Sequence, residues 1–277
     1  MLPLETWSAE RRSPIFGIFT DIDDTLTTEG AITDDALEAL VRLKTAGLHV
    51  IAITGRPVGW SIPFARSWPV DAIVAENGAV ALVRQVNDSP QGEVPTGLRR
   101  IYQQDEQTRT LNFSRMQQVT ARILREVPGS TTAADSSGRE TDIAIDHSEF
   151  SHLTKAQIGQ VVAIMQAEGM SATVSSIHVN GWYGAHNKLE GARWIVRELF
   201  ARSLDAERSR WAYVGDSTND QLMFEAFDNS IGVANIRRFV PELNHLPHFV
   251  TRSERGAGFS EVAHALLQTR TSDLGGV

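Results

Sequence analysis

One stretch of the sequence joins a strand-forming run to a cluster of acids: Ile15-Phe16-Gly17-Ile18-Phe19-Thr20-Asp21-Ile22-Asp23-Asp24-Thr25-Leu26-Thr27. Its apolar half predicts a strand that is buried on both faces, as in a parallel sheet. Three carboxylates at the end of such a strand cost free energy unless a cation or a chemical task holds them there. Ligands of open α/β sheets bind outside the carboxyl ends of the strands, so these acids lie where a functional site is expected.

The three acids are suited to catalysis at phosphorus. A carboxylate can act as a nucleophile and form an aspartyl-phosphate. A second carboxylate two residues further on could act as a general acid and then as a base. Clustered acids also suit Mg²⁺, which takes oxygen ligands and keeps positions for water and substrate phosphate. The alternative is that Asp and Thr only form a turn or start a helix here, since both residue types favour those positions.

The composition limits the possible partners and locations. The 277 residues are enough for one large domain or two ordinary ones. A formal net charge of -8 disfavours broad binding to nucleic acid or to anionic membranes, which need basic surface. The chain has no cysteine, which excludes disulfides and fits a reducing compartment. Neither a membrane span nor a signal peptide is recognisable, so we expect a cytoplasmic protein.

Strands and helices alternate before residue 84 and again from Lys188, as in an α/β fold with a mostly parallel sheet. The Asn77-Gly78 pair is a hairpin signal and predicts that the strand after it runs antiparallel. The elements expected in these two halves are a helix from 33 to about 46, strands over 48–53, 71–75 and 79–83, a helix over 188–200, strands over 211–214, 229–233 and 248–250, and helices ending at about 227 and spanning 259–268.

The section between these halves breaks the alternation and predicts a separate α+β module. Its expected elements are a loop at 87–92 within a polar stretch over 84–110, helices over 113–127 and 153–168, and strands over 141–146, 170–175 and 176–181. The domain prediction is therefore a core of residues 1–83 plus 186–277 and an inserted domain of residues 84–185. An insertion beside a site is well placed to act as a lid. Residues 1–13 are expected to be a weakly packed lead-in.

Four polar motifs follow the expected strands in order: Asp21-Ile-Asp23-Asp-Thr-Leu, Thr54-Gly55, Lys188 at a helix start, and Gly215-Asp216-Ser-Thr-Asn219-Asp220. In this order and at these separations they resemble the haloacid dehalogenase superfamily of phosphotransferases. The resemblance spans the whole predicted core and implies a Rossmann-like, doubly wound sheet. Each motif alone has a plainer interpretation, because Thr54 could end a strand, Lys188 could be solvated, and Asp216 could cap a helix.

The resemblance implies a role for each motif. Asp21 would attack phosphorus, and Asp23 would protonate the leaving oxygen and then activate water. Mg²⁺ would bind Asp21, the backbone carbonyl of Asp23, and Asp216. The residues that would hold phosphate are Thr54, Gly55 and Lys188. Asn219 and Asp220 would support the metal ligands and orient the lysine, and Asp24 would add a hydrogen bond around them. Asp24 departs from the glycine that is common at its position in the family.

The inserted module resembles the αββ-type (C2B) cap of subclass IIB, which includes sucrose-phosphate, mannosyl-3-phosphoglycerate and Cof-type phosphatases, and also phosphomannomutases. Substrate contacts would come from residues near the cap: Arg56, Asn77, His178, Asn180 and Trp182. Trp182 could instead pack the cap–core junction, and Arg56 could make an ion pair. For Arg139, Glu140 and Asp142 we expect a solvated rim.

The resulting expectation is a Mg²⁺-dependent phosphatase that acts on a phosphorylated sugar or a similar small metabolite. Its partner would be that small phosphomonoester, with no nucleic acid or membrane, and the chain would be a monomer or homodimer. A phosphomutase is the first alternative, and a non-catalytic module that binds a phosphorylated ligand is the second. A dinucleotide-dependent dehydrogenase is disfavoured, because no Gly-x-Gly-x-x-Gly follows the first strand.

Overall fold

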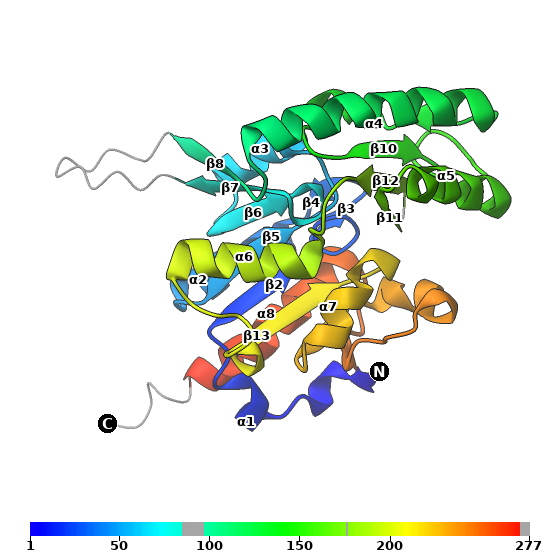
Figure 1. Cartoon of the computed structure of the whole chain (residues 1–277). Helices are drawn as coiled ribbons and strands as arrows, with labels where there is room; N and C mark the ends of the chain where they lie inside the picture. The colour runs from blue at the N-terminus through cyan, green and yellow to red at the C-terminus, as the bar shows by residue number, and fades with distance from the viewer. Residues whose placement is uncertain (85–96, 176, 272–277) are drawn as a thin grey trace.

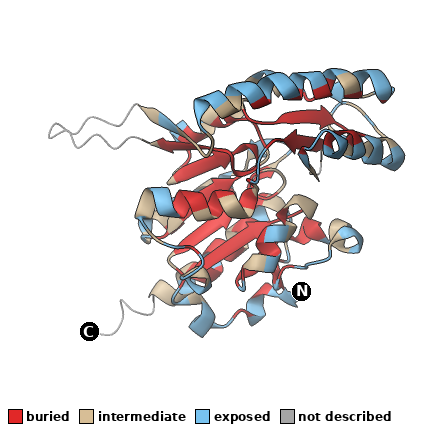
Figure 2. Cartoon of the chain, in the orientation of Figure 1, coloured by how far each residue is buried: buried red, intermediate tan, exposed pale blue. Residues whose placement is uncertain are grey.

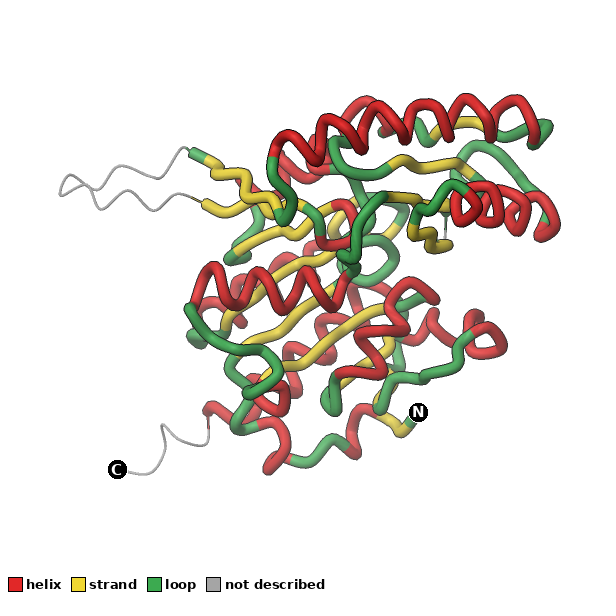
Figure 3. The backbone as a smooth tube through the Cα atoms, in the orientation of Figure 1, coloured by secondary structure: helices red, strands yellow, loops and turns green. Residues whose placement is uncertain are grey.

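The computed structural model describes residues 1–84, 97–175 and 177–271 (Figures 1 and 3). In this part of the chain a nine-stranded sheet has the order β1-β15-β14-β13-β2-β5-β6-β7-β8. Its strands are β1 (Leu2–Pro3), β2 (Gly17–Thr20), β5 (His49–Ile53), β6 (Ala72–Ala75), β7 (Val80–Arg84), β8 (Leu98–Tyr102), β13 (Trp211–Gly215), β14 (Ser230–Gly232) and β15 (Phe249–Val250). Pairing is parallel from β1 to β6 and antiparallel for the last two pairs.

Strand β2 lies in the middle of the sheet and is buried on both faces, as its apolar run predicts. Ile18 belongs to the core cluster on one face, which α2, α3 and α8 cover. Phe19 belongs to the cluster on the other face, which α6 and α7 cover. The helices of this part are α1 (Ala9–Arg12), α2 (Asp34–Thr45), α3 (Val58–Ser67), α6 (Lys188–Phe200), α7 (Gln221–Ala226) and α8 (Arg255–Thr271). The predicted doubly wound α/β core is therefore present.

Short elements connect these layers. A small hairpin of β3 (Thr27–Thr28) and β4 (Ala31–Ile32) follows the acidic motif. The single-turn and longer 3₁₀ segments are η1 (Leu4–Thr6), η2 (Glu76–Gly78), η3 (Ser136–Gly138), η4 (Arg208–Arg210), η5 (Thr218–Asp220) and η6 (Ala234–Glu242). Segment η2 lies at the predicted Asn-Gly turn, and β6 and β7 pair antiparallel around it.

The inserted module packs over the carboxyl end of the core sheet (Figure 1). It contains a four-stranded antiparallel sheet in the order β11-β12-β10-β9. Its strands are β9 (Thr131–Thr132), β10 (Ile143–Asp146), β11 (Ser171–Val174) and β12 (His178–Trp182), and its helices are α4 (Glu106–Glu126) and α5 (Lys155–Ala167). The two helices cover one face of this sheet through a cluster of their own, which includes Met116, Ile145 and Val161 (Figure 2). We call this module, from α4 to β12, the cap.

One strand within the range predicted for the inserted domain belongs to the core sheet. Strand β8 lies within the predicted range 84–185, but it pairs with β7 in the core sheet, with Leu82 opposite Arg100. Helix α4 begins at Glu106 rather than at 113, because Asp105 caps it by accepting from the Thr108 N–H at 2.9 Å. Its first turns are polar and show no apolar periodicity. The predicted loop at 87–92 lies outside the described residues.

The predicted loose lead-in over residues 1–13 is wrong. Strand β1 adds to the sheet edge beside β15, with Leu2 opposite Phe249. Trp7 is 1% exposed, and its indole N–H donates to Asn229 Oδ1 at 3.2 Å. The segment thus packs against the core, which a short stretch with no internal repeat pattern could not reveal.

None of the helices in the described ranges combines the length and apolar character needed to span a bilayer.

Candidate active site

The motif residues meet at the carboxyl edge of the core sheet. Asp21 follows β2, Thr54 follows β5 and Asp216 follows β13, and these three strands are neighbours with parallel register. A cavity lies between this edge and the cap. Residues of both parts line it: Asp21, Asp23, Gly55, Arg56, Ser175, Ile177, His178, Asn180, Asp216, Ser217 and Asn219. The fold therefore brings the first and fourth motifs together beneath the cap.

Lys188 lies at the centre of the charged groups. It is 3% exposed at the start of α6, and its Nζ donates to Asp21 Oδ1 and to Asp220 Oδ1, each at 2.6 Å. Burial alone would lower the pKa of Lys188, but the two carboxylates outweigh it and hold that pKa above its ordinary value. Asn187 caps the helix by accepting from the Glu190 N–H at 3.0 Å. This cap fixes the start of α6 and places Lys188 at its first position. The cation is thus charged and held beside Asp21.

Asp220 is fully occupied by hydrogen-bond donors. Its Oδ1 accepts from Lys188 and from the Tyr213 hydroxyl, and its Oδ2 accepts from the backbone N–H groups of Asp216 at 2.9 Å and Ser217 at 3.2 Å. A Cβ at Gly215 would lie 2.4 Å from Asp220 Oδ2, so a glycine is required for this approach. The geometry suits Asp220 to orienting the lysine. Asn219 lies nearby, with its Oδ1 3.4 Å from Lys188 Nζ.

Three carboxylates could hold a metal ion here. Asp21, Asp216 and Asp220 offer oxygens that lie within 4.8 Å of one another. Burial, together with Asp21, Asp220 and Asp24, raises the pKa of Asp216 well above its ordinary value. Burial chiefly, with Asp220 and Asp23 adding and Lys188 opposing, raises the pKa of Asp21 to about 8. Both shifts mark negative charge that one lysine does not neutralise, and a divalent cation would relieve it.

The acids differ in how available they are to a cation. The four donors on Asp220 leave Asp21 and Asp216 as the side chains best able to bind one. Asn235 donates to Asp216 Oδ2 at 3.0 Å and so orients that carboxylate. The Asp23 side chain turns away toward Arg56, which leaves its backbone as the part that could reach a metal. Hard oxygen ligands of this kind fit Mg²⁺.

Asp24 lies at the edge of this cluster. Its φ of 54° is left-handed, which fits the glycine that is common at this position in the family. Its carboxylate accepts from Arg238 at 3.1 Å and lies 3.0 Å from Arg255 Nε. Asn235 Nδ2 donates to its backbone carbonyl at 3.0 Å. The side chain therefore pairs with two arginines that the sequence analysis did not single out.

The second motif is buried beside the cavity. Thr54 Oγ1 accepts from the Arg56 backbone N–H at 3.0 Å, and Gly55 lines the cavity. A Cβ at Gly55 would lie 3.2 Å from Asn77 Oδ1, so the two residues are in contact. Asn77 donates to Asp142 of the cap at 3.4 Å, and it lies on the core side of the cap–core contact.

The three cap candidates separate into two groups. His178 and Asn180 lie on the face of β12 that is directed toward the core, and both line the cavity. Trp182 does not line it. Its indole N–H donates to the His186 carbonyl at 2.8 Å, and its ring stacks on His186 with centroids 5.5 Å apart. The packing alternative for Trp182 is the one that this geometry favours.

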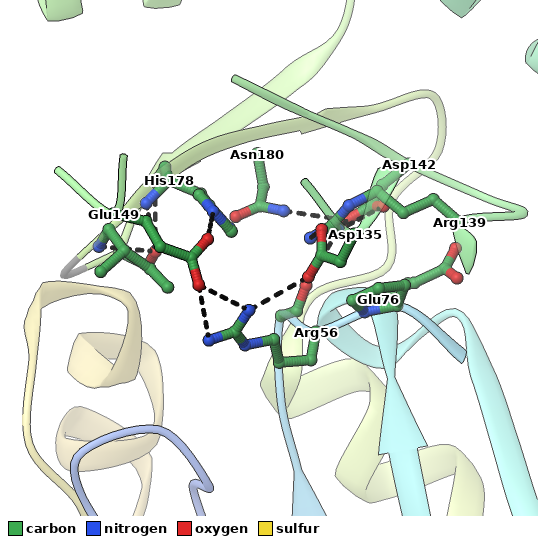
Figure 4. A network of polar contacts seen from close by, with 12 residues as sticks. Arg56, Glu76, Asp135, Arg139, Asp142, Glu149, His178 and Asn180 are labelled. Atoms are coloured by element: carbon green, nitrogen blue, oxygen red, sulfur yellow. Dashed lines mark hydrogen bonds and ion pairs between the residues drawn. The ribbon is translucent and has the colours of Figure 1, made fainter. Parts of the chain in front are cut away.

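A polar network across the cap–core contact was not anticipated (Figure 4). Arg139 and Asp142 were expected at a solvated rim, but they are 5% and 1% exposed. Arg139 donates to Asp142 at 2.8 Å and to the Gly55 carbonyl at 3.0 Å. The buried Glu76 carboxylate accepts from the Val58 N–H at 2.9 Å and from Thr141. Burial raises the pKa of Glu76 despite these donors. No local sequence signal marks these pairings.

The structure has the features of a capped haloacid dehalogenase fold. These are the parallel sheet, the aspartates and lysine at its carboxyl edge, and a cap inserted between the second and third motifs. The family model described as haloacid dehalogenase-like hydrolase matches residues 18–94. The chain is similar to this family over that stretch, which contains the first two of its four motifs. A relative from Streptococcus pyogenes serotype M6, which carries the provisional name of a phosphatase, is 23% identical over 273 residues, covering 90% of this chain and 96% of the relative.

Solved structures share the whole fold. A Thermoplasma acidophilum protein matches with a TM-score of 0.68 at 15% identity, over 91% of this chain and 98% of that one. The sucrose-phosphatase of Synechocystis, solved with sucrose and phosphate, matches with a TM-score of 0.63 at 15% identity, over 91% and 97%. A subclass IIB sugar phosphatase matches with a TM-score of 0.60 at 15% identity, over 91% and 98%. At these sequence identities the structural likeness is evidence for a shared fold alone.

Proposed function

We propose that this chain is a Mg²⁺-dependent phosphatase that hydrolyses a phosphorylated sugar or a similar small phosphomonoester. The observation that carries the proposal is the buried Lys188 between Asp21 and Asp220, with Asp21 lining the same cavity as Asp23. This is a nucleophile beside a fixed cation, with a second carboxylate in reach of a leaving group. The phosphatase relatives and the fold shared with sugar phosphatases support the same reaction.

The first chemical step forms a covalent intermediate. An Asp21 oxygen attacks phosphorus, and the bond from phosphorus to the leaving oxygen breaks. The electron pair of that bond goes to the leaving oxygen, which takes the proton of Asp23 and departs as an alcohol. Lys188, Thr54 and Gly55 would stabilise the charge on the phosphoryl oxygens.

The second step returns the enzyme to its starting state. The Asp23 carboxylate takes a proton from water, whose oxygen attacks phosphorus. The bond from phosphorus to Asp21 breaks, its electron pair returns to the carboxylate, and inorganic phosphate leaves. A bound Mg²⁺, held by Asp21, Asp216 and the Asp23 carbonyl, would supply the charge neutralisation that lets an anionic substrate approach these acids. Asn219 and Asp220 would keep Lys188 and the acids in place.

The cap side of the cavity supports a hydroxylated leaving group. His178 and Asn180 present an imidazole and an amide there, groups that exchange hydrogen bonds with hydroxyls. A phosphomutase would also need a cationic site for a second phosphate. Among the described residues that line the cavity, the Lys or Arg side chain is that of Arg56 from the core, and three carboxylates already surround it. Hydrolysis is therefore the better supported of the two reactions.

Phosphate release from a panel of phosphorylated metabolites, with Mg²⁺ or with chelator, tests the proposal. Release should need Mg²⁺. The Asp21→Asn variant should lose on the order of 10⁴ in turnover, because the nucleophile is removed while the shape is kept. Asp228→Asn, an exposed carboxylate on the core, is the matched control and should keep full activity.

Other outcomes would point to a different mechanism or a different function. Near-normal turnover by Asp21→Asn would exclude the covalent mechanism, and full activity in chelator would exclude the metal assignment. Activity that depends on a bisphosphate would identify a mutase. Binding of phosphorylated ligands with no release from any of them would identify a binding module.

A further inference from the structure

One core arginine lies between the proposed proton donor and two carboxylates of the cap. Arg56 Nε donates to both oxygens of Asp23, at 3.0 and 3.1 Å. Its terminal nitrogens donate to Asp135 at 3.2 Å and to Glu149 at 3.4 and 3.5 Å. Figure 4 shows the guanidinium directed at both cap residues. The Arg56 side chain is 10% exposed and its three carboxylate partners are 13–23% exposed, so the four groups form one partly buried cluster.

The backbone of Arg56 is held by the core, whereas the terminal nitrogens of its guanidinium group are held by the cap. Its backbone N–H donates to Thr54 Oγ1 at 3.0 Å, and its guanidinium carbon lies 5.1 Å from the Trp60 ring centroid. Because a guanidinium is a rigid plane, carboxylates on its terminal nitrogens also set the direction of Nε. Asp23 therefore receives its orientation partly from residues that never touch it.

The two cap carboxylates are themselves fixed. Asp135 accepts from Arg139 at 3.2 Å. The Oε2 atom of Glu149 is hydrogen-bonded to His178 Nε2 at 2.8 Å, and the Glu149 backbone N–H donates to Asp146 Oδ1 at 2.9 Å. These supports come from within the cap, so both carboxylates move with it as a unit. Their contact with Arg56 exists only when the cap lies on the core as it does in this structure.

We propose that Asp135 and Glu149 are positioning residues that act through Arg56 to align Asp23 with the leaving oxygen when the cap is closed. This inference rests on the proposed phosphatase function and adds a coupling between cap position and proton transfer. With the cap lifted, Arg56 loses two of its three anionic partners, and Asp23 loses its fixed orientation. Protonation of the leaving group is then confined to the closed state, where a substrate is enclosed.

The test compares two leaving groups. An alkoxide must receive the Asp23 proton as its bond to phosphorus breaks, whereas p-nitrophenolate leaves without one. We measure kcat/KM for the best alkyl phosphate of the panel and for p-nitrophenyl phosphate. In Asp135→Asn and in Glu149→Gln the ratio of the two should fall about tenfold, part of the 10² to 10⁴ that general acid catalysis supplies. Arg56→Lys should lower the ratio as well, because an ammonium cannot span all three carboxylates.

Two variants bracket this result. Asp23→Asn gives the largest fall in the ratio that loss of the proton donor can cause. Glu242→Gln removes a different ion pair between core and cap, the exposed contact to Lys155 at 3.2 Å, and should leave the ratio unchanged. Because Asp135 does not line the cavity, its variant separates positioning from substrate contacts through His178.

Each outcome decides between distinct conclusions. Equal losses on both substrates, or ratios within about twofold of the wild type in Asp135→Asn and Glu149→Gln, would overturn the positioning role. A wild-type chain inactive on both substrates would instead overturn the proposed function. Circular-dichroism melts identify any variant that fails to fold, and the two single variants sit on separate loops, so either one can carry the test.

Discussion

Two buried residues beside the site, Asp220 and His186, differ in how fully their polar atoms are hydrogen-bonded. Asp220 has four donors on its two oxygens, so its charge is compensated where it lies. His186 is 5% exposed, and in the described part of the chain its Nε2 has no hydrogen-bond partner. Burial lowers the pKa of His186 to about 4, so the ring stays neutral near pH 7. The ring stacks on Trp182, with centroids 5.5 Å apart.

The buried imidazole makes stability depend on pH in a known direction. The unfolded chain takes up a proton at His186 near pH 6.5, and the folded chain does so only near pH 4. The folded state is therefore favoured above pH 6.5 and loses up to about 3 kcal/mol as pH falls toward 4. Urea unfolding at several pH values should show a smaller loss in His186→Gln than in the wild type. Parallel curves for the two proteins would contradict the assignment.

Helix α3 and the cap segment η3 are in close contact. A Cβ at Gly59 would lie 2.8 Å from Gly138 Cα, so the start of α3 and η3 meet backbone to backbone. Segment η3 is flanked by Asp135 and Arg139, which carry the network around Arg56. Glu76 ties the same region together, because it accepts from Val58 of α3 and from Thr141 of the cap. These elements hold the cap against the core.

A single methyl group at this contact should loosen the cap. Gly59→Ala forces η3 away from α3, and with it Asp135. We expect a lower melting temperature and a several-fold lower kcat/KM on alkyl phosphates. The control is Gly159→Ala in α5, where the added Cβ meets nothing within 4 Å. That change should stabilise the helix by about 0.5–1 kcal/mol and leave activity unchanged. Equal stability and activity in the two variants would show that the close contact does not matter.

The chain as a whole contains separate hydrophobic clusters. The two clusters of the core draw on residues up to Tyr102 and from Leu189 onward, and the cluster of the cap lies between Met116 and Tyr183. Polar contacts join the core to the cap, among them Asn77 to Asp142 at 3.4 Å and Arg139 to the Gly55 carbonyl at 3.0 Å. Each part therefore has an apolar interior of its own, which favours the division into two domains.

Removing the cap tests that division. The chain enters and leaves the cap near Gly78, since Gln103 donates to the Gly78 carbonyl at 2.8 Å and a Cβ at Gly78 would lie 2.4 Å from Asn187 O. A short Gly-Ser linker in place of residues 104–186 can join these ends. We expect the core to melt cooperatively and to keep its Mg²⁺ affinity in titration calorimetry. It should lose turnover of alkyl phosphates, because the cap residues that would fix Arg56 are gone. A core that does not fold would contradict the two-domain description.

The sequence by itself determined the α/β class, the order of most elements and the four motifs. These features are local: a strand buried on both faces is an apolar run, Asn-Gly favours a tight turn, and a motif residue follows the strand that carries it. The helix over Lys188–Phe200 and the antiparallel turn at Asn77-Gly78 were predictable for this reason.

Only the tertiary structure decided which distant groups meet. It placed Leu98–Tyr102 in the core sheet, packed Trp7 against the core, and buried Arg139 and Asp142 instead of leaving them at a rim. It also joined Arg56 to carboxylates 79 and 93 residues further along the chain. A charged side chain looks solvated in sequence because its partner is not beside it. Whether burial of that charge is stable depends on a partner that folding alone brings within hydrogen-bond distance.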